Sequence, residues 1–269
     1  MKVLIACEYS GVVRDAFARK GHDATSCDFL PSDSPNGKHY QGNMFDLIYP
    51  HNVYDWDLII AHPPCTHLSL SGSKYWAEKV KDGRQPAAIR FVERIWDLHE
   101  QSGVKLCIEN PVGALSSRSK LGKATQYIQP YEFGHPDKKR TGLWLRGLPK
   151  LEPTDVIDIT KVDPKIANRL HLLSPSADRW KIRSRTFQGI ADAMAEQWGW
   201  VYLLMTFSSS IVYNAGWGHH PPRCLHHYIH ATKSKNIHMR QVYWCITTHR
   251  HSHRWVSYRH TLWVQQCIS

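Results

Sequence analysis

Short apolar runs alternate with amphipathic stretches along residues 2–145 of the chain. Apolar residues with helical spacing are clearest in the stretch 86–101, where Ile89, Val92 and Ile95 form a stripe. The predicted strands are 2–7, 23–27, 57–61, 104–108 and 141–145, and the predicted helices are 12–20 and 86–101. This alternation predicts an α/β fold with a doubly wound, mostly parallel sheet.

Three other segments complete the predicted domain. The stretch 30–42 is rich in Pro, Ser, Asn and Gly, which predicts a loop. Residues 150–182 are polar and proline-rich, and we interpret them as a small insertion or lid. Residues 186–199 predict a turn followed by a final helix. We therefore expect one α/β domain over 1–205.

The composition of the chain changes after this domain. Residues 207–269 hold seven Lys or Arg, ten of the 18 His and four of the 11 Trp, but neither Asp nor Glu. Globular sequence rarely has this composition, and we interpret 206–269 as a basic, His- and Trp-rich tail that is a non-native or disordered extension.

A nucleic-acid-binding arm and a metal site are alternative interpretations of the tail. The side chains that could ligate a metal are Cys224, His226, His227, His249, His251 and His253. Their spacing matches no regular zinc module, so no metal ligand is assigned.

Charge and composition limit the class of protein. The formal net charge of +11 favours a polyanionic partner such as nucleic acid, but the body 1–206 has 27 basic and 23 acidic residues and carries only +4. The sequence has no apolar stretch of about 18 residues that would predict a membrane span. Its seven cysteines lack paired spacing, which fits reduced thiols. We expect a cytoplasmic monomer with no membrane partner.

One predicted strand ends in a thiol. The strand 57–61 continues through His62, Pro63 and Pro64 into Cys65, and the two prolines stop the strand and stiffen the turn. A partly exposed thiol at the tip of a strand is a candidate nucleophile. The structural alternative is a small buried cysteine.

A second predicted strand ends in a carboxyl. The strand 104–108 is followed by Glu109, and neighbouring parallel strands would bring Glu109 and Cys65 to one crevice. Partial desolvation should raise the pKa of Glu109, so that it carries a proton near neutral pH. The structural alternative is a helix cap or an ion pair.

A cationic cluster precedes the strand 141–145. It contains Arg140, and such a cluster can hold a phosphate or a base carbonyl. The structural alternative is a solvated charged turn.

These motifs, Pro-Pro-Cys, Glu-Asn-Pro and the Arg-containing turn, occur in an order that resembles the DNA cytosine-5 methyltransferase family. The segment 6–11 (ACEYSG) looks like the first motif of that family, and 189–194 (GIADAM) looks like its last. The resemblance covers roughly residues 2–200. It is closest to compact, phage-encoded methylase-like proteins.

The resemblance implies a Rossmann-like methyltransferase fold. It also implies methyl transfer from S-adenosylmethionine to C5 of a flipped cytosine in DNA, through a covalent bond between a cysteine and C6. Carried over to this chain, Cys65 is the nucleophile, Glu109 binds or protonates N3, and Arg140 orients the substrate. The residues that the resemblance assigns to the cofactor are Glu8, Tyr9, Ser10, Gly11, Asp28, Asn43, Pro63 and Gly189.

The chain departs from the family pattern in three places. Residues 12–14 replace a glycine-rich turn, Asn43 replaces an aspartate, and only 146–185 remain as a reduced target-recognition region. The basic residues there that could contact phosphate are Lys161, Lys165, Arg169, Arg179, Lys181, Arg183 and Arg185.

Two other functions therefore stay open. One is a catalytically inactive, methylase-like DNA-binding or anti-restriction protein. The other is C5 modification of another pyrimidine substrate. In each case we expect the protein in the cytoplasm of a bacterial or phage-infected cell.

Overall fold

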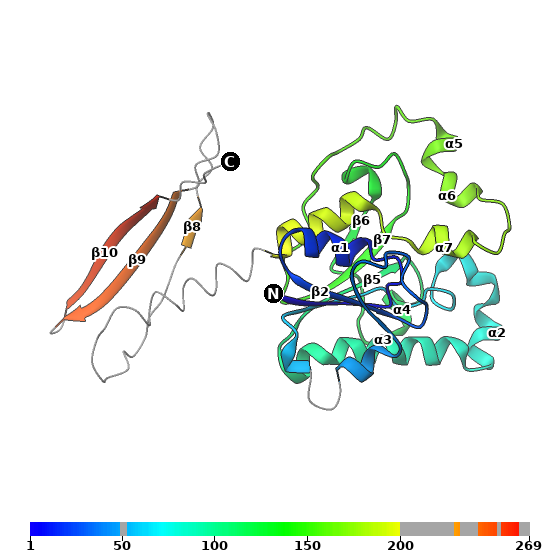
Figure 1. The fold of residues 1–269 in the computed structure, drawn as a ribbon, viewed down its shortest axis with the longest axis horizontal. Helices are drawn as coiled ribbons and strands as arrows, with labels where there is room; N and C mark the ends of the chain where they lie inside the picture. Colours follow the sequence, from blue (N-terminus) through cyan, green and yellow to red (C-terminus); the bar gives the residue numbers. More distant parts are fainter. Residues whose placement is uncertain (49–52, 200–228, 232–241, 252–253, 264–269) are drawn as a thin grey trace. The chain divides into compact units, whose positions relative to one another are not determined.

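Seven strands form a mixed sheet in the first of two units (Figure 1). The computed structural model describes residues 1–48, 53–199, 229–231, 242–251 and 254–263, and the chain divides into the units Met1–Val212 and Tyr213–Ser269. The strands of the first unit are β1 (Lys2–Ala6), β2 (Asp23–Asp28), β3 (Lys38–Gln41), β4 (Leu58–Ala61), β5 (Lys105–Pro111), β6 (Gln126–Ile128) and β7 (Thr141–Arg146).

The order of strands across the sheet is β3-β2-β1-β4-β5-β7-β6. Strands β1 to β5 pair in parallel, whereas β7 is antiparallel to both β5 and β6. The predicted α/β fold with a mostly parallel sheet is confirmed, and this order is compatible with a Rossmann-like fold.

Helices cover both faces of the sheet, as doubly wound topology requires (Figure 1). The α-helices of the first unit are α1 (Val12–Arg19), α2 (Trp76–Lys81), α3 (Arg84–Ser102), α4 (Leu115–Arg118), α5 (Pro164–Ala167), α6 (Arg169–Leu172), α7 (Arg179–Ser184) and a helix over 188–199. The 3₁₀ turns are η1 (Met44–Leu47), η2 (Val53–Asp55), η3 (Leu70–Tyr75) and η4 (Pro130–Glu132).

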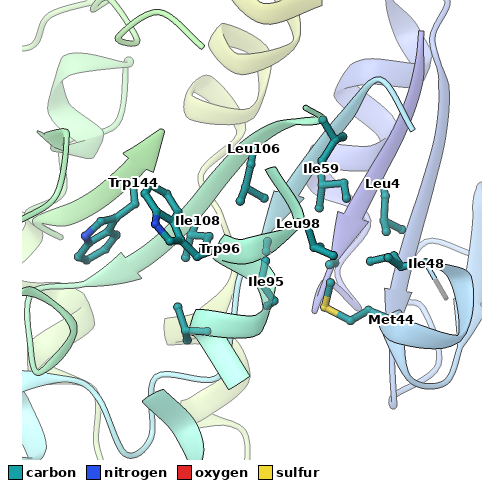
Figure 2. Close-up of a cluster of buried hydrophobic side chains, with 14 of the residues drawn as sticks. Leu4, Met44, Ile48, Ile59, Ile95, Trp96, Leu98, Leu106, Ile108 and Trp144 are labelled. Atoms are coloured by element: carbon teal, nitrogen blue, oxygen red, sulfur yellow. The ribbon is translucent and has the colours of Figure 1, made fainter. Parts of the chain in front are cut away.

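The apolar stripe of α3 forms the core on one face of the sheet. Gly83 and Gly103 begin and end this helix with φ of 82° and 74°, a left-handed conformation that favours glycine. Figure 2 shows α3 residues such as Ile95 against Leu106 of β5 and Ile59 of β4. Burial of these side chains is the main term that holds α3 on the sheet.

The opposite face is covered by α1 and the helix 188–199. Phe17 of α1 and Trp198 pack with Val3, Ile5 and Ile60 in a second core cluster. The alternation of core residues along β1 and β4 between the two faces follows from the two-residue period of a strand. The same two-residue period also determines which face of the sheet is occupied by the residues that directly follow each strand.

Two parts of the sheet were not predicted. Strand β3 lies inside the expected loop 30–42; its sequence, KHYQ, is polar because it pairs only with β2 at the sheet edge. Strand β6 has three residues, too few for a visible alternation. The expected insertion 150–182 holds the short helices α5 and α6 and part of α7.

The second unit contains β8 (Ile229–Ala231), β9 (Val242–His251) and β10 (Arg254–Trp263), which pair in the antiparallel order β10-β9-β8. The tail interpreted as a non-native or disordered extension lies mostly outside the described residues. Of the candidate metal ligands there, Cys224, His226, His227 and His253 also lie outside them. Within the described part of the chain, no helix is long and apolar enough to cross a membrane.

Leu106→Ala tests the core on the α3 face. Leu106 is completely buried, so the substitution should lower the free energy of unfolding by about 2–5 kcal/mol. Val156→Ala is the control; Val156 is 67% exposed, and its substitution should change stability by less than about 0.5 kcal/mol. Urea titration of both variants measures the difference. Equal stabilities would contradict the packing described here.

Candidate functional site

The order in which strands are added to the sheet reverses between β1 and β4. Strands β2 and β3 follow β1 in the sequence and lie on one side of it, whereas β4 and β5 lie on its other side. Ligands of doubly wound sheets bind at such a switch point, beyond the carboxyl ends of the strands.

A crevice of about 550 Å³, including space open to solvent, lies at this point. Its lining residues are Cys7, Glu8, Tyr9, Ser10, His62, Pro63, Pro64, Cys65, Glu109, Asn110, Pro111, Lys139, Arg183, Ser184, Arg185 and Thr186. The structure thus brings Cys65 and Glu109 to one crevice, together with four of the predicted cofactor residues.

Sheet register places four of the residues at this edge in one row, which we call the terminal row. The last register pairs at the ends of these strands are Ala6 with Cys27, Ala6 with Ala61, and Ala61 with Ile108. One position further along each strand, the terminal row consists of Asp28, Cys7, His62 and Glu109.

Cys7 turns the chain at the end of β1. Its φ of 58° makes it the only non-glycine residue with positive φ in the described part of the chain. A left-handed residue at a ligand crevice is a strained feature that functional sites often hold.

The loop that carries Cys65 is fixed at both ends. The amides of Leu68 and Ser69 each donate to the Cys65 carbonyl at 2.9 Å, which closes a tight turn after the thiol. Asn110 Nδ2 donates to the Pro63 carbonyl at 2.8 Å and ties the loop to the end of β5. These bonds hold the thiol beside Glu109.

A glycine allows the same loop to approach the chain after β5. The Ala114 amide donates to the Leu68 carbonyl at 2.7 Å, and a Cβ on Gly113 would collide with that carbonyl oxygen. Glycine is therefore required at 113 for this close approach.

Charges around the Cys65 thiol act in opposite directions. Burial and the negative charge of Glu109 raise its pKa, whereas the positive charges of Lys139 and Arg183 lower it. The net pKa lies above the ordinary value, so the free protein holds Cys65 mainly as the thiol.

The pKa of Glu109 departs from the sequence expectation. Burial raises the pKa, but the hydrogen bond from His62, the charge of Lys139 and the hydroxyl of Thr141 outweigh it and lower the pKa below its usual value. His62 Nδ1 lies 3.0 Å from Glu109 Oε2. The prediction that Glu109 carries a proton near neutral pH is therefore wrong for the free protein, because partners replace the lost water.

Lys139, rather than Arg140, lines the crevice. The Arg140 guanidinium lies over the ring of Tyr127, 4.3 Å from its centroid. Successive residues of an extended segment point in opposite directions, so only one of the two can face Glu109. The role assigned to Arg140 stays a prediction.

Glu8 caps helix α1 from the floor of the crevice. Its carboxylate accepts from the amides of Val13 at 2.7 Å and Arg14 at 3.2 Å, and from the Ser10 hydroxyl at 3.2 Å. A carboxylate at a helix N-terminus satisfies free N–H groups and complements the helix dipole. Glu8 and Ser10 therefore shape the turn after β1.

Arg14 fills the space beside Gly11 where the family pattern has further glycines. It is fully buried, and its guanidinium donates to Ser26 and Ser32 hydroxyls at 3.0 and 3.2 Å and to the Ser34 carbonyl at 2.8 Å. Arg14 thereby fixes the loop after β2. Gly11 has a φ of 74° and precedes α1 outside the crevice lining.

Tyr9 joins the crevice to the reduced recognition region. Its hydroxyl donates to the Lys181 carbonyl at 3.1 Å and lies 3.2 Å from the Ser184 hydroxyl, and its ring packs on Trp180. Helix α7 thus covers one side of the crevice, and Arg183 reaches into it.

The other predicted cofactor residues lie outside the crevice lining. Asp28 Oδ1 accepts from the Leu30 amide at 3.0 Å, and Asn43 Oδ1 caps η1 by accepting from Phe45 at 3.1 Å. The Gly189 amide donates to His135 at 2.9 Å, and a Cβ at 189 would strike the Phe133 carbonyl. Gly189 therefore packs the last helix tightly, and its cofactor role stays a prediction.

Sequence reasoning gave no individual role to His62, Lys139 or Thr186, and it named Arg183 and Arg185 only as candidate phosphate contacts. His62 directly precedes Pro-Pro-Cys, so the register of adjacent parallel strands could have found it beside Glu109. No comparable signal placed Arg183 or Thr186 at the crevice, because their positions depend on how α7 and the segment after it pack.

A scan of the chain against protein-family models and a search of curated proteins find no match. What the crevice can do therefore follows from its own side chains, which include the Cys65 thiol, a buried His–carboxylate pair and the cations Lys139, Arg183 and Arg185.

Glu109→Gln should increase the reactivity of Cys65. Because the Glu109 charge raises the pKa of the thiol, the neutral isostere lowers that pKa and increases the thiolate fraction near neutral pH. We expect alkylation of Cys65 by iodoacetamide to become about three- to tenfold faster, followed by mass spectrometry of its peptide. Lys139→Gln should slow the same reaction. Unchanged rates in both variants would contradict this electrostatic description.

Proposed function

We propose that this protein is a DNA cytosine-5 methyltransferase with a Rossmann-like methyltransferase fold. The observation that carries the proposal is the crevice at the switch point, where Cys65 and Glu109 lie together. Addition to C6 of a pyrimidine needs a soft nucleophile on carbon and a proton donor to the ring nitrogen. A thiol and a carboxyl from adjacent strands provide that pair.

The covalent step assigns one bond to each group. The Cys65 thiolate forms the S–C6 bond, the C5–C6 π electrons move toward C5, and N3 gains a proton from Glu109. C5 is then nucleophilic. After C5 has accepted a methyl group, a base removes the C5 proton, the S–C6 bond breaks as the C5–C6 double bond re-forms, and N3 returns its proton to Glu109. These steps regenerate the thiolate and the protonated carboxyl. The positive charges of Lys139 and Arg183 favour the thiolate throughout.

The residues at this sheet edge suit S-adenosylmethionine, which supplies an electrophilic methyl group when bound. The Asp28 carboxylate can accept from ribose hydroxyls, and the adjacent Phe29 ring, 74% exposed, can stack on adenine. Asn110 lines the crevice, and its buried Oδ1 has no hydrogen-bond partner in the described residues, so it can accept from an amino group. Glu8, Ser10 and Pro63 would border the methionine part.

DNA is the proposed partner, with the target cytosine flipped out of the helix. Ion pairs occupy three of the candidate phosphate contacts: Lys161 with Asp158, Arg169 with Asp137, and Arg185 with Asp33. Lys181 and Trp180 lie on α7, and Trp180 is half exposed beside the crevice. A cation and a stacking ring at the mouth suit a nucleic-acid strand. We propose that the protein acts as a monomer in the cytoplasm.

Methylation of cellular DNA tests the proposed function. Cells that make the full chain should contain 5-methylcytosine in their DNA, and Cys65→Ser should reduce it to the background level because an alcohol is a far weaker nucleophile toward C6. Cys27→Ser is the matched control and should retain activity, since a hydroxyl preserves the bond from Cys27 to the Gly42 carbonyl. Nucleoside mass spectrometry gives the readout.

Other outcomes of that measurement would support the alternatives. Tight DNA binding without any methylated base would favour a catalytically inactive DNA-binding or anti-restriction protein. A modified pyrimidine other than 5-methylcytosine would indicate another substrate for the same thiol.

Lys181→Gln tests the proposed DNA contact on α7. Removing one phosphate contact should weaken binding to all sequences and reduce the slope of log K against log salt by about 0.9. Lys161→Gln is the control, because Asp158 already pairs with Lys161 at 3.2 Å. Fluorescence anisotropy over a range of salt concentrations measures both slopes. An unchanged slope for Lys181→Gln would exclude this contact.

A further inference from the structure

His62 lies between Cys7 and Glu109 in the terminal row. Strand β4 lies between β1 and β5, so the residue after β4 stands between the ends of those two strands. The His62 amide donates to the Ala6 carbonyl at 2.9 Å, which continues the sheet register by one residue. Ile60 and Cys107 belong to the core on the α1 face, and two residues later His62 and Glu109 share that face.

The contacts of His62 define its protonated nitrogen. Glu109 is ionised and can only accept, so His62 Nδ1 carries a hydrogen and donates to Oε2 at 3.0 Å. The side chains of His62 and Glu109 are only 9% and 13% exposed. A buried, charge-assisted bond of this kind is strong and fixes the orientation of both groups.

The other ring nitrogen of His62 lacks a partner. Nε2 is buried and makes no hydrogen bond to the described residues. A histidine with a purely structural role usually has both nitrogens satisfied, because an unpartnered buried polar atom costs about 1–3 kcal/mol. Nε2 is therefore an unsatisfied polar atom beside the crevice within the described residues.

The charges that face the pair come from several elements. Glu8, at the end of β1, lies close enough that the charge of His62 affects its pKa. The titratable and charged groups that act on His62, Glu109 or the adjacent thiol are Glu8, Cys65, Cys107, Lys139 and Arg183. The positive charge of Lys139 opposes a proton on Glu109.

We propose that His62 is a positioning residue that supplies the proton which Glu109 passes to N3 of the base, an inference that rests on the proposed function. The pair begins as imidazolium and carboxylate. The proton on His62 Nδ1 moves to Glu109 Oε2, and a proton on Glu109 moves to N3 as the Cys65 thiolate forms the S–C6 bond. His62 ends neutral, Glu109 ends ionised, and the adduct is neutral, so atoms and charge balance.

The pH dependence of methyl transfer in His62→Asn tests this proposal. The Asn amide can donate from the position of Nδ1 but cannot release a proton near neutral pH. Glu109 alone must then hold the proton, and a carboxyl ordinarily loses its proton about 2 pH units below an imidazole. We expect the alkaline limb of the rate profile to move toward acid by this amount, with about a hundredfold loss near neutral pH.

Two variants control for structural effects. His99→Asn changes a histidine that bonds the Val104 carbonyl at 2.8 Å, outside the crevice lining, and should keep the wild-type limb. If His62→Asn does not fold, as judged by its thermal unfolding, His62→Gln takes its place. An alkaline limb at the wild-type pH, with only a uniform loss of rate, would overturn the proposal.

A measurement without cofactor or DNA separates this inference from the proposed function. Carbon-13 NMR of labelled glutamate should show the titration of Glu109 moving to higher pH in His62→Asn, because the positive charge of His62 is lost. An unchanged midpoint would overturn the inference whether or not methyl transfer occurs. A shifted midpoint in a protein whose wild type makes no methylated base would instead reject the proposed function, and the assigned proton transfer with it.

Discussion

The hydrogen bond between His62 and Glu109 joins the ends of β4 and β5 at the point where the crevice opens. Both side chains lie almost out of solvent, where an isolated charge would be very costly. Each therefore depends on the other, and on Lys139 and Thr141, to remain in place. Removing one partner would leave the other as an uncompensated buried polar group, which is far more costly than losing a surface ion pair.

A second constraint fixes the thiol relative to this pair. The bond from Asn110 to the Pro63 carbonyl and the close approach at Gly113 attach the Cys65 loop to the segment that carries Glu109. Cys65 and Glu109 thus lie on segments that are joined by direct contacts, although 44 positions separate the two residues in the sequence. Rigid placement of this kind is what the proposed addition of a thiol to a pyrimidine ring requires.

The sequence predicts those parts of the molecule that depend on local pattern. Uniformly apolar runs identify β4 and the first part of β5, and the residues that follow these runs identify Cys65 and Glu109. The ionisation of Glu109 could not be predicted in this way, because it depends on partners from β4 and from the start of β7. Lys139 and α7 are positioned by long-range packing, and β3 is a polar edge strand without an apolar signal.

The free protein holds its two reactive groups in the opposite ionisation states to those that addition requires. Glu109 is a carboxylate, and its charge helps to keep Cys65 a thiol. A proton placed on Glu109 removes that charge and so lowers the pKa of Cys65. In the proposed reaction, protonating the carboxyl that would face the ring nitrogen therefore also favours the thiolate that would attack the ring carbon. His62, bonded to Glu109 and close to Glu8, is the group placed to deliver that proton, so one transfer would prepare both halves of the reaction.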